Sequence, residues 1–304
     1  MRDFTQHHWQ TQTERDFEQL LELALIEDTE TTGDLTSLIL LSAADQGSAA
    51  VAARSAGVLA GNPLVPKILS AVDPELVWDP ILDDSAELTC GTVVGIIRGS
   101  AAGILLAERL VLNFLGRLSG VATLTKRYVD AIRGTGSQIY DTRKTTPGWR
   151  RLEKYAVRCG GGKNHRTGLY DAVLIKDNHL VQGRRGDHPF SPAQAVLQAK
   201  DILRGRFAEL PIVEIEVDTL DQLREVLPAD PDIVLLDNMT SAQITEAIQI
   251  RNSVNPKVQL EASGGITLET VRVIAETGVE RISVGALTHS AVSLDFGLDW
   301  SMTS

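Results

Sequence analysis

The stretch IVEIEVDTLDQLREVLPADPDIVLLD, residues 212–237, holds the pattern that decides the fold. Two short apolar runs, 212–217 and 233–237, flank residues 219–227, whose apolar side chains recur at helical spacing. Similar runs and helix-like stretches continue on both sides, with runs at 138–141, 172–176, 258–263 and 281–285 and helix-like stretches at 241–251 and 268–276. Alternating strands and helices imply a parallel sheet with right-handed crossovers. Their number favours an α/β barrel, and a doubly wound sheet is the alternative.

The first part of the chain reads as mixed α/β. Residues 14–26 have apolar side chains at helical spacing. Short strand-like pieces follow at 48–53, 57–60 and 92–97, separated by Gly and Pro. Residues 101–133 are predicted as two helices broken near Ser119-Gly120.

Composition limits the class of protein. The 304 residues are 43% hydrophobic and 23% charged, which is typical of a soluble globular protein. No apolar run approaches the roughly 20 residues that span a bilayer, and the polar N-terminus has no signal pattern. Cys90 and Cys159 lack the spacing of a disulfide framework or a zinc site. A cytoplasmic protein is the simplest interpretation. The net charge of −11 argues against a nucleic-acid or membrane-surface binder.

That charge is unevenly distributed. Residues 141–179 contain nine Lys or Arg against four acids, a local excess of +5 in an otherwise acidic chain. Taken alone, such a run is more often a solvated basic face than an anion-binding site. The positions of individual residues must decide between the two.

Polar residues lie where the apolar runs end. They are Asp141, Lys176, Glu216, Asp237 and Ser263. In a parallel barrel this end of the strands carries the active site. Any one of them could be a capping residue, but five at equivalent places indicate a pocket.

Two loops supply cations and donors. DTRKTTPG, residues 141–148, places Thr142, Arg143 and Lys144 after a strand, and Arg offers a planar fork for carboxylate or phosphate. GGGKNHR, residues 160–166, joins glycines, whose backbone can approach an anion closely, to His165 and Arg166. A surface turn and a flexible linker are the alternatives.

Two further groups complete the predicted pocket. Glu216 and Asp237 are suited to bind sugar hydroxyls, hold magnesium or stabilise positive charge on a sugar ring. Alternation along the strand places Glu214 and Asp218 on the same face, so the sequence does not single out Glu216. Glycine-rich strand ends favour a phosphate site, namely Ser263, Gly264 and Gly265 and then Val284, Gly285 and Ala286. Elsewhere Arg109, Asn113 and Arg117 form a polar stripe that is usually the wet face of a helix.

At this point the chain resembles the quinolinate phosphoribosyltransferase family. The resemblance is carried first by DTRKTTPG (141–148), LEKYAV (152–157), GGG (160–162), NHR (164–166), GL (168–169) and LIKDNH (174–179). It extends to ED (27–28), GDLT (33–36), AER (107–109), NFL (113–115), LSG (118–120), EIEV (214–217), LDN (236–238) and EASGG (261–265). The motifs therefore span nearly the whole chain.

The resemblance implies an N-terminal α/β sandwich domain, residues 1–118, and an open, incomplete α/β barrel, residues 119–288, with the tail 289–304 packing back on the first domain. It implies a decarboxylating phosphoribosyltransferase of NAD biosynthesis. Quinolinate and phosphoribosyl pyrophosphate would give nicotinate mononucleotide, pyrophosphate and CO2, with Mg²⁺. A homodimer or larger homo-oligomer is expected, in which one subunit covers the barrel mouth of another.

The resemblance also assigns roles. Arg143, His165, Arg166 and Lys176, with Arg109 of a partner subunit, would receive the quinolinate carboxylates and nearby phosphate. Lys144 would bind phosphate or carboxylate, and Thr142 lies beside it. Glu216 and Asp237 would hold ribose hydroxyls and magnesium. Ser263, Gly264, Gly265 and Val284 to Ala286 would hold the 5′-phosphate. Lys144, Lys176, Glu216 and Asp237 are the expected catalytic residues.

One departure and two rivals remain. Residues 183–207, with Arg184, Arg185, Asp187, His188 and Pro189, are longer and more polar than the resemblance leads us to expect. A paralogue of the same fold acting on another pyridine or nucleotide is the nearest rival, and Lys176 with His165-Arg166 favours the quinolinate enzyme. A non-catalytic sensor of phosphorylated ligands is the second rival, and it would not need Glu216 and Asp237.

Overall fold

The structure, a computed structural model, describes residues 2–185 and 188–300. The chain forms two compact units, and neither is one continuous stretch. Within the described residues, 2–6, 127–144 and 162–286 form the barrel unit, and 7–126, 145–161 and 287–300 form the sandwich unit. No helix in the described part of the chain is long and apolar enough to cross a membrane.

A six-stranded parallel sheet is the frame of the barrel unit. Its strands, in spatial order, are β6 (Gln138–Tyr140), β13 (Arg281–Ser283), β12 (Gln259–Ser263), β11 (Ile233–Asp237), β10 (Ile212–Val217) and β7 (Ala172–Ile175). Residues 233–236 are all buried, as expected for a parallel strand covered on both faces. Strands β6 and β7 are the two edges and do not pair with each other, so within the described residues the barrel is open.

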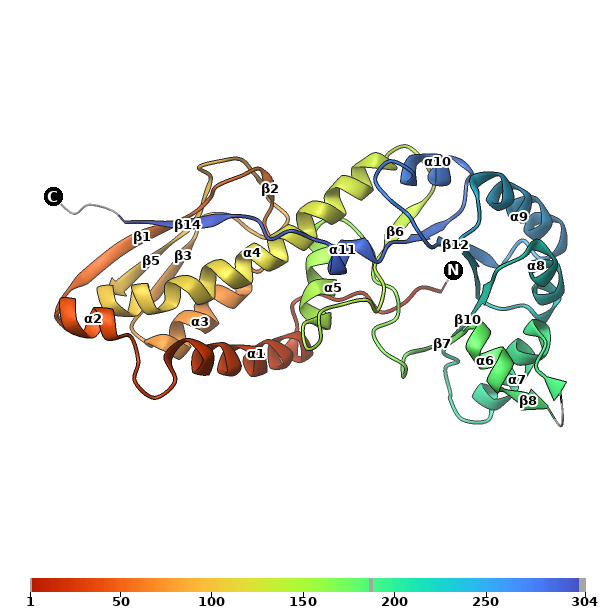
Figure 1. Ribbon diagram of the computed structural model, residues 1–304, viewed down its shortest axis with the longest axis horizontal. Coiled ribbons are helices and arrows are strands. Elements are labelled where there is room, and N and C mark those ends of the chain that lie inside the picture. Colours follow the sequence, from red (N-terminus) through yellow and green to blue (C-terminus); the bar gives the residue numbers. More distant parts are fainter. Residues whose placement is uncertain (1, 186–187, 301–304) are drawn as a thin grey trace. The chain divides into compact units, whose positions relative to one another are not determined.

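Helices connect the strands on the outer side of this sheet (Figure 1). They are α6 (Asp177–Gln182), α7 (Pro192–Arg204), α8 (Leu220–Val226), α9 (Ser241–Val254) and α10 (Val271–Glu276), with a 3-10 turn at Leu227–Ala229. Thr219 and Thr240 begin α8 and α9 by accepting hydrogen bonds from the backbone N–H groups of Gln222 and Gln243. The predicted strand–helix alternation is confirmed.

The long segment 183–207 contains structure that the sequence reasoning did not assign. Two short strands, β8 (Arg184–Arg185) and β9 (His188–Pro189), form a hairpin before α7. Asp187 lies outside the described residues. Ser191 caps α7, Pro192 is its first residue, and Gln194 completes the capping box. This Ser-Pro-x-Gln pattern is typical of a helix N-terminus, so the start of α7 could have been predicted from the sequence.

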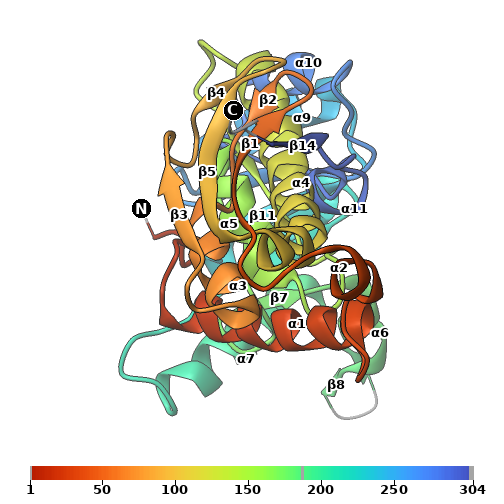
Figure 2. The ribbon, with the colours of Figure 1, turned by 90° about the vertical axis from the view of Figure 1, so that its left-hand side faces the viewer.

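An antiparallel sheet is the frame of the sandwich unit. Its strand order is β14 (Phe296–Trp300), β1 (Gln46–Ala53), β5 (Val93–Ser100) and β3 (Val77–Pro80). Figures 1 and 2 show α4 (Ala101–Ala131) running along one face of this sheet. The other elements are α1 (Thr11–Thr29), α2 (Leu35–Leu40), β2 (Gly57–Val58), a 3-10 turn at Asn62–Leu64, α3 (Val65–Val72), β4 (Glu87–Leu88), α5 (Arg150–Cys159) and α11 (Ala286–His289).

The predicted break at Ser119-Gly120 is wrong, because α4 continues through it. The glycines serve close packing instead. A Cβ on Gly120 would lie 2.1 Å from the carbonyl oxygen of Val292, and one on Gly116 would lie 2.8 Å from that of Leu294. The backbone N–H of Leu294 donates to the Gly116 carbonyl at 2.9 Å. Two glycines one turn apart therefore make room for residues 292–294 along the helix.

Candidate active site

Neighbouring strands of the barrel unit carry polar side chains at their carboxyl ends. Lys176 follows β7, Glu216 is the penultimate residue of β10, and Asp237 ends β11. Ile175 is in register with Ile215, and Asp237 with Ser263. Because the strands are parallel, their ends meet at one edge, and the sequence-predicted residues are brought together there.

Lys176 and Glu216 form an ion pair through Nζ and Oε2. The Glu216 side chain is 11% exposed and that of Lys176 is 44% exposed. Burial raises the pKa of the Glu216 carboxyl, Lys176 opposes this shift, and the negative charge of Asp237 adds to it. Glu216 and Asp237 thus repel each other. A shared cation, or a positive charge that develops on a substrate, would relieve this repulsion.

Two guanidinium groups of the same unit lie near enough to influence each other. Burial lowers the pKa of Arg166, and the positive charge of Arg143 lowers it further. Arg166 donates to the Ala172 carbonyl at 3.2 Å, whereas the buried Nε of Arg143 has no hydrogen-bond partner among the described residues. Like charges held together with donor capacity to spare are suited to bind an anion. Lys144 is exposed beside them, and its N–H donates to the Thr142 hydroxyl at 3.0 Å.

The glycine-rich strand ends leave open space. Gly264 and Gly265 have φ of +92° and +61°, and nothing lies within 4 Å of a Cβ built on Gly265. A Cβ on Gly264 would meet the Asn238 side chain at 2.2 Å. Ser263 is half-buried, and the buried Val284, which precedes Gly285 and Ala286, donates its N–H to the backbone carbonyl of Tyr140. This turn could accept a phosphate close to its backbone.

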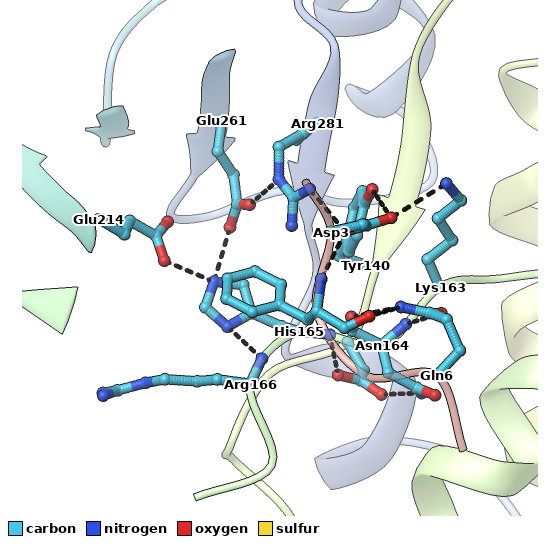
Figure 3. Close-up of polar contacts among 12 residues, drawn as sticks. Asp3, Gln6, Tyr140, Lys163, Asn164, His165, Arg166, Glu214, Glu261 and Arg281 are labelled. Atoms are coloured by element: carbon cyan, nitrogen blue, oxygen red, sulfur yellow. Dashed lines mark hydrogen bonds and ion pairs between the residues drawn. The ribbon is translucent and has the colours of Figure 1, made fainter. Parts of the chain in front are cut away.

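His165 lies between the side chains of Glu214 and Glu261 and the backbone N–H of Arg166 (Figure 3). Its side chain is 6% exposed, and Nε2 lies 3.1 Å from Oε2 of Glu214 and 3.3 Å from Oε1 of Glu261. Its Nδ1 accepts a hydrogen bond from the Arg166 backbone N–H at 2.8 Å. Both ring nitrogens have protein partners, so His165 would reach a substrate carboxylate only by exchanging one of them.

Charge explains why this buried cluster is tolerated. Burial lowers the pKa of His165, but Glu214 and Glu261 outweigh it and raise that pKa to about 9. Burial raises the pKa of Glu261, yet His165 and Arg281 together lower it to about 2. While Nδ1 accepts this hydrogen bond, the proton of the neutral ring lies on Nε2, between the two carboxylates; an imidazolium has a proton on both nitrogens and would release the Arg166 N–H.

The same cluster has the composition of a metal site, with ligand atoms of His165, Glu214 and Glu261 within 4.8 Å of one another. The hydrogen bond to Nδ1 argues against a metal there, because it leaves the proton on Nε2, the atom that would have to bind the ion. Glu216 and Asp237 fit a hard cation better. Their partly exposed oxygens lie at the strand ends, where phosphate oxygens could complete the shell.

The predicted polar stripe on α4 divides into two roles, both within the sandwich unit. Arg109 is 70% exposed and lines a cavity of about 400 Å³ with Asn113, Glu27 and Asp28. Arg117 instead donates to Glu153, which also accepts from the N–H and the hydroxyl of Thr146. Arg117 is therefore structural, whereas the exposed Arg109 has a long ion pair with its neighbour Glu108, at 3.7 Å, that an anion could replace.

Comparison with known proteins agrees with this arrangement. Residues 34–119 match the N-terminal domain of quinolinate phosphoribosyl transferase, and residues 121–299 match its C-terminal domain. The chain belongs to the quinolinate phosphoribosyltransferase family. A nicotinate-nucleotide pyrophosphorylase (carboxylating) of Mycobacterium leprae is 42% identical over 91% of this chain and 94% of that protein. A mitochondrial quinolinate phosphoribosyltransferase (decarboxylating) of Nicotiana tabacum is 37% identical over 93% and 82%.

The solved structures give the same family. That of the nicotinate-nucleotide pyrophosphorylase from Francisella tularensis superposes with a TM-score of 0.89 at 35% identity, covering 98% of this chain and all of that one. The predicted sandwich and open barrel of the family are confirmed. Of the buried cluster, Glu214 was predicted only to share a face with Glu216, and Glu261 and Arg281 were missed. Glu261 was visible only as an acid in the family motif EASGG, and Arg281 gave no signal.

Proposed function

We propose that this protein is a decarboxylating quinolinate phosphoribosyltransferase of NAD biosynthesis. It converts quinolinate and phosphoribosyl pyrophosphate into nicotinate mononucleotide, pyrophosphate and CO2. The observation that carries the proposal is that one barrel unit holds both a pair of neighbouring cations, Arg143 and Arg166, and a pair of neighbouring carboxylates, Glu216 and Asp237. A sensor of anions would need only the first pair.

The two pairs serve different steps of the reaction. Quinolinate is a dianion and the sugar is polyphosphorylated, so cations must offset their repulsion before the pyridine nitrogen can approach C1 of the ribose. Arg143 and Arg166 take the carboxylates, and Lys144 takes phosphate or carboxylate beside Thr142. The turn at 263–265 and residues 284–286 take the 5′-phosphate.

Bond exchange at C1 then follows. The pyridine nitrogen forms a bond to C1 as the pyrophosphate oxygen leaves with the electron pair. Glu216 and Asp237 stabilise the positive charge that develops on the sugar ring, and Lys176 holds the Glu216 carboxylate in place. Loss of CO2 from the carbon next to the new ring cation leaves an electron pair that this cation stabilises, and a proton then replaces the carboxylate.

Three further expectations belong to this proposal. Mg²⁺ is the cofactor, held by Glu216, Asp237 and the phosphates of the substrate, where it would offset the charge of the leaving pyrophosphate. The protein is a homodimer or larger homo-oligomer, with the exposed Arg109 of one subunit completing the site of another. Its location is cytoplasmic, on the sequence grounds given above.

The test is a direct assay. Purified protein with quinolinate, phosphoribosyl pyrophosphate and Mg²⁺ should yield nicotinate mononucleotide and CO2 in equal amounts, and a chelator should abolish the product. Lys176→Met is the matched variant. It should lower kcat/KM by about 100-fold or more and change stability by less than about 1 kcal/mol, because its ion pair is partly exposed. Absence of the mononucleotide, with turnover of nicotinate or another base instead, would refute the assignment.

A further inference from the structure

The first residues of the chain belong to the barrel unit, although those from His7 onward belong to the sandwich unit. Asp3, Phe4 and Gln6 lie outside both stretches that match the family domains. They contact three consecutive residues of the predicted carboxylate-binding loop. Asp3 contacts Lys163 and Gln6 contacts Asn164 (Figure 3). Phe4 contacts His165.

Gln6 and Asn164 make a reciprocal pair. The N–H of Asn164 donates to Oε1 of Gln6 at 2.9 Å, and Nε2 of Gln6 donates back to the Asn164 carbonyl at 3.1 Å. On its other side the Asn164 side chain donates to Asp141 at 2.6 Å, and the His165 N–H donates to Asp141 at 2.9 Å. The loop is therefore held between the N-terminal peptide and the end of β6.

Phe4 supports the imidazole directly. Its ring is 6% exposed, packs with Ala172, Ile212 and Ile233, and lies 4.3 Å from the His165 ring between centroids. His165 in turn accepts the Arg166 N–H, so the orientation of the imidazole fixes the backbone that carries the Arg166 guanidinium.

Asp3 ties the peptide to the charged cluster. It accepts from Tyr140 at 3.1 Å, from Lys163 at 3.1 Å and from Arg281 at 2.9 Å. The Arg281 guanidinium lies over the Phe4 and Tyr140 rings, 4.9 and 3.7 Å from their centroids, and donates to Glu261 at 2.8 Å. Packing alone would need Phe4; it would not need the directed bonds of Asp3 and Gln6.

We infer that residues 3–6 are a positioning segment for quinolinate: they hold the His165-Arg166 loop in the geometry that receives the pyridine dicarboxylate. This inference rests on the proposed function. The phosphate turn at 263–265 and the carboxylates Glu216 and Asp237 come from other strands and make none of these contacts. Disturbing the segment should therefore weaken the binding of quinolinate and leave the binding of phosphoribosyl pyrophosphate unchanged.

The experiment compares Phe4→Leu and Gln6→Ala with Phe296→Leu in the full-length protein. Phe296 is an equally buried phenylalanine, 6% exposed, on β14 of the sandwich unit. Phe4→Leu and Gln6→Ala should raise the KM for quinolinate about tenfold and leave the KM for phosphoribosyl pyrophosphate within about twofold. Phe296→Leu should lower Tm and change neither KM. If all three variants lower Tm alone, the segment is only packing and the inference is overturned.

A second measurement separates this inference from the proposed function. In Gln6→Ala the backbone N–H of Asn164 loses the Gln6 side chain as its acceptor. Its hydrogen exchange should therefore accelerate at least about tenfold, while the backbone N–H groups of β11 keep their protection. If the wild-type protein makes no nicotinate mononucleotide but exchange at this N–H is faster in Gln6→Ala, the assigned reaction is wrong and the anchoring of the loop by residues 3–6 stands. Unchanged exchange at Asn164 overturns the anchoring whatever the activity.

Discussion

Two glutamates on one strand, Glu214 and Glu216, lie in different environments although both are on the same face. Glu214 is fully buried against His165, and Glu216 is paired with Lys176 near the strand end. Two residues of rise, roughly 6–7 Å along β10, separate the interior of the barrel from its mouth. Depth in the barrel, rather than residue type, separates the carboxylate that is buried against His165 from the carboxylate that lies near the strand ends.

The buried cluster predicts a pH dependence of stability. The pKa of His165 is raised from 6.5 to about 9, so its contribution is complete below pH 6.5 and is lost as pH rises through 9. The pKa of Glu261 is lowered to about 2, so its contribution is present above pH 4.5 and is lost as pH falls toward 2. Between these windows the cluster stabilises the fold most.

Urea unfolding at pH 6 and pH 9 checks this expectation. Between pH 6 and pH 9 the free energy of unfolding of the wild-type protein should fall by up to about 3 kcal/mol more than that of His165→Gln, because each unit of pKa shift is worth about 1.4 kcal/mol. The glutamine keeps the volume and a donor but does not titrate. Parallel losses in the two proteins would show that the cluster does not hold the proton.

At the scale of elements, α4 owes its packing to glycines that sequence rules treat as helix breakers. In an exposed helix, alanine would be favoured over glycine by about 1 kcal/mol. At Gly120 the carbonyl oxygen of Val292 occupies the space of a Cβ, and backbone cannot turn aside as a side chain can. Close approach of two chain segments therefore outweighs local propensity.

Gly120→Ala should destabilise the protein by about 1–3 kcal/mol, measured as the free energy of unfolding in urea. Gly205→Ala is the control, because φ there is −80° and the nearest atom to its Cβ is 3.6 Å away. That variant should be neutral or slightly stabilising. Equal stability of the two variants would contradict the packing of residues 292–294 on α4.

For the whole molecule, the predicted site residues are distributed over the two units. The barrel unit carries the strand-end residues, and the sandwich unit carries Arg109. If Arg109 completes the site of a partner subunit, variants that lack either half should complement each other. The active-site residues of one subunit would then depend on assembly with a second.

Arg109→Ala and Lys144→Ala, each nearly inactive, should regain about one quarter of wild-type activity when their subunits are mixed and exchanged. In a two-fold dimer about half of the molecules are then mixed, and each mixed dimer has one intact site of two. Activity and subunit exchange are measured on the same sample. Verified exchange without recovery would place Arg109 in its own subunit's site or in none.

The sequence by itself determined the strand–helix alternation, the strand-end placement of Lys176, Glu216, Asp237 and Ser263, and the family. These features are local, since they follow from periodicity and from motifs read along one stretch of chain. Only the tertiary structure decided that α4 is unbroken, that Glu214 and Glu261 enclose His165, and that residues 3–6 reach the barrel. Each of these depends on contacts between residues far apart in the chain, as between Phe4 and His165, and no local pattern encodes such distances.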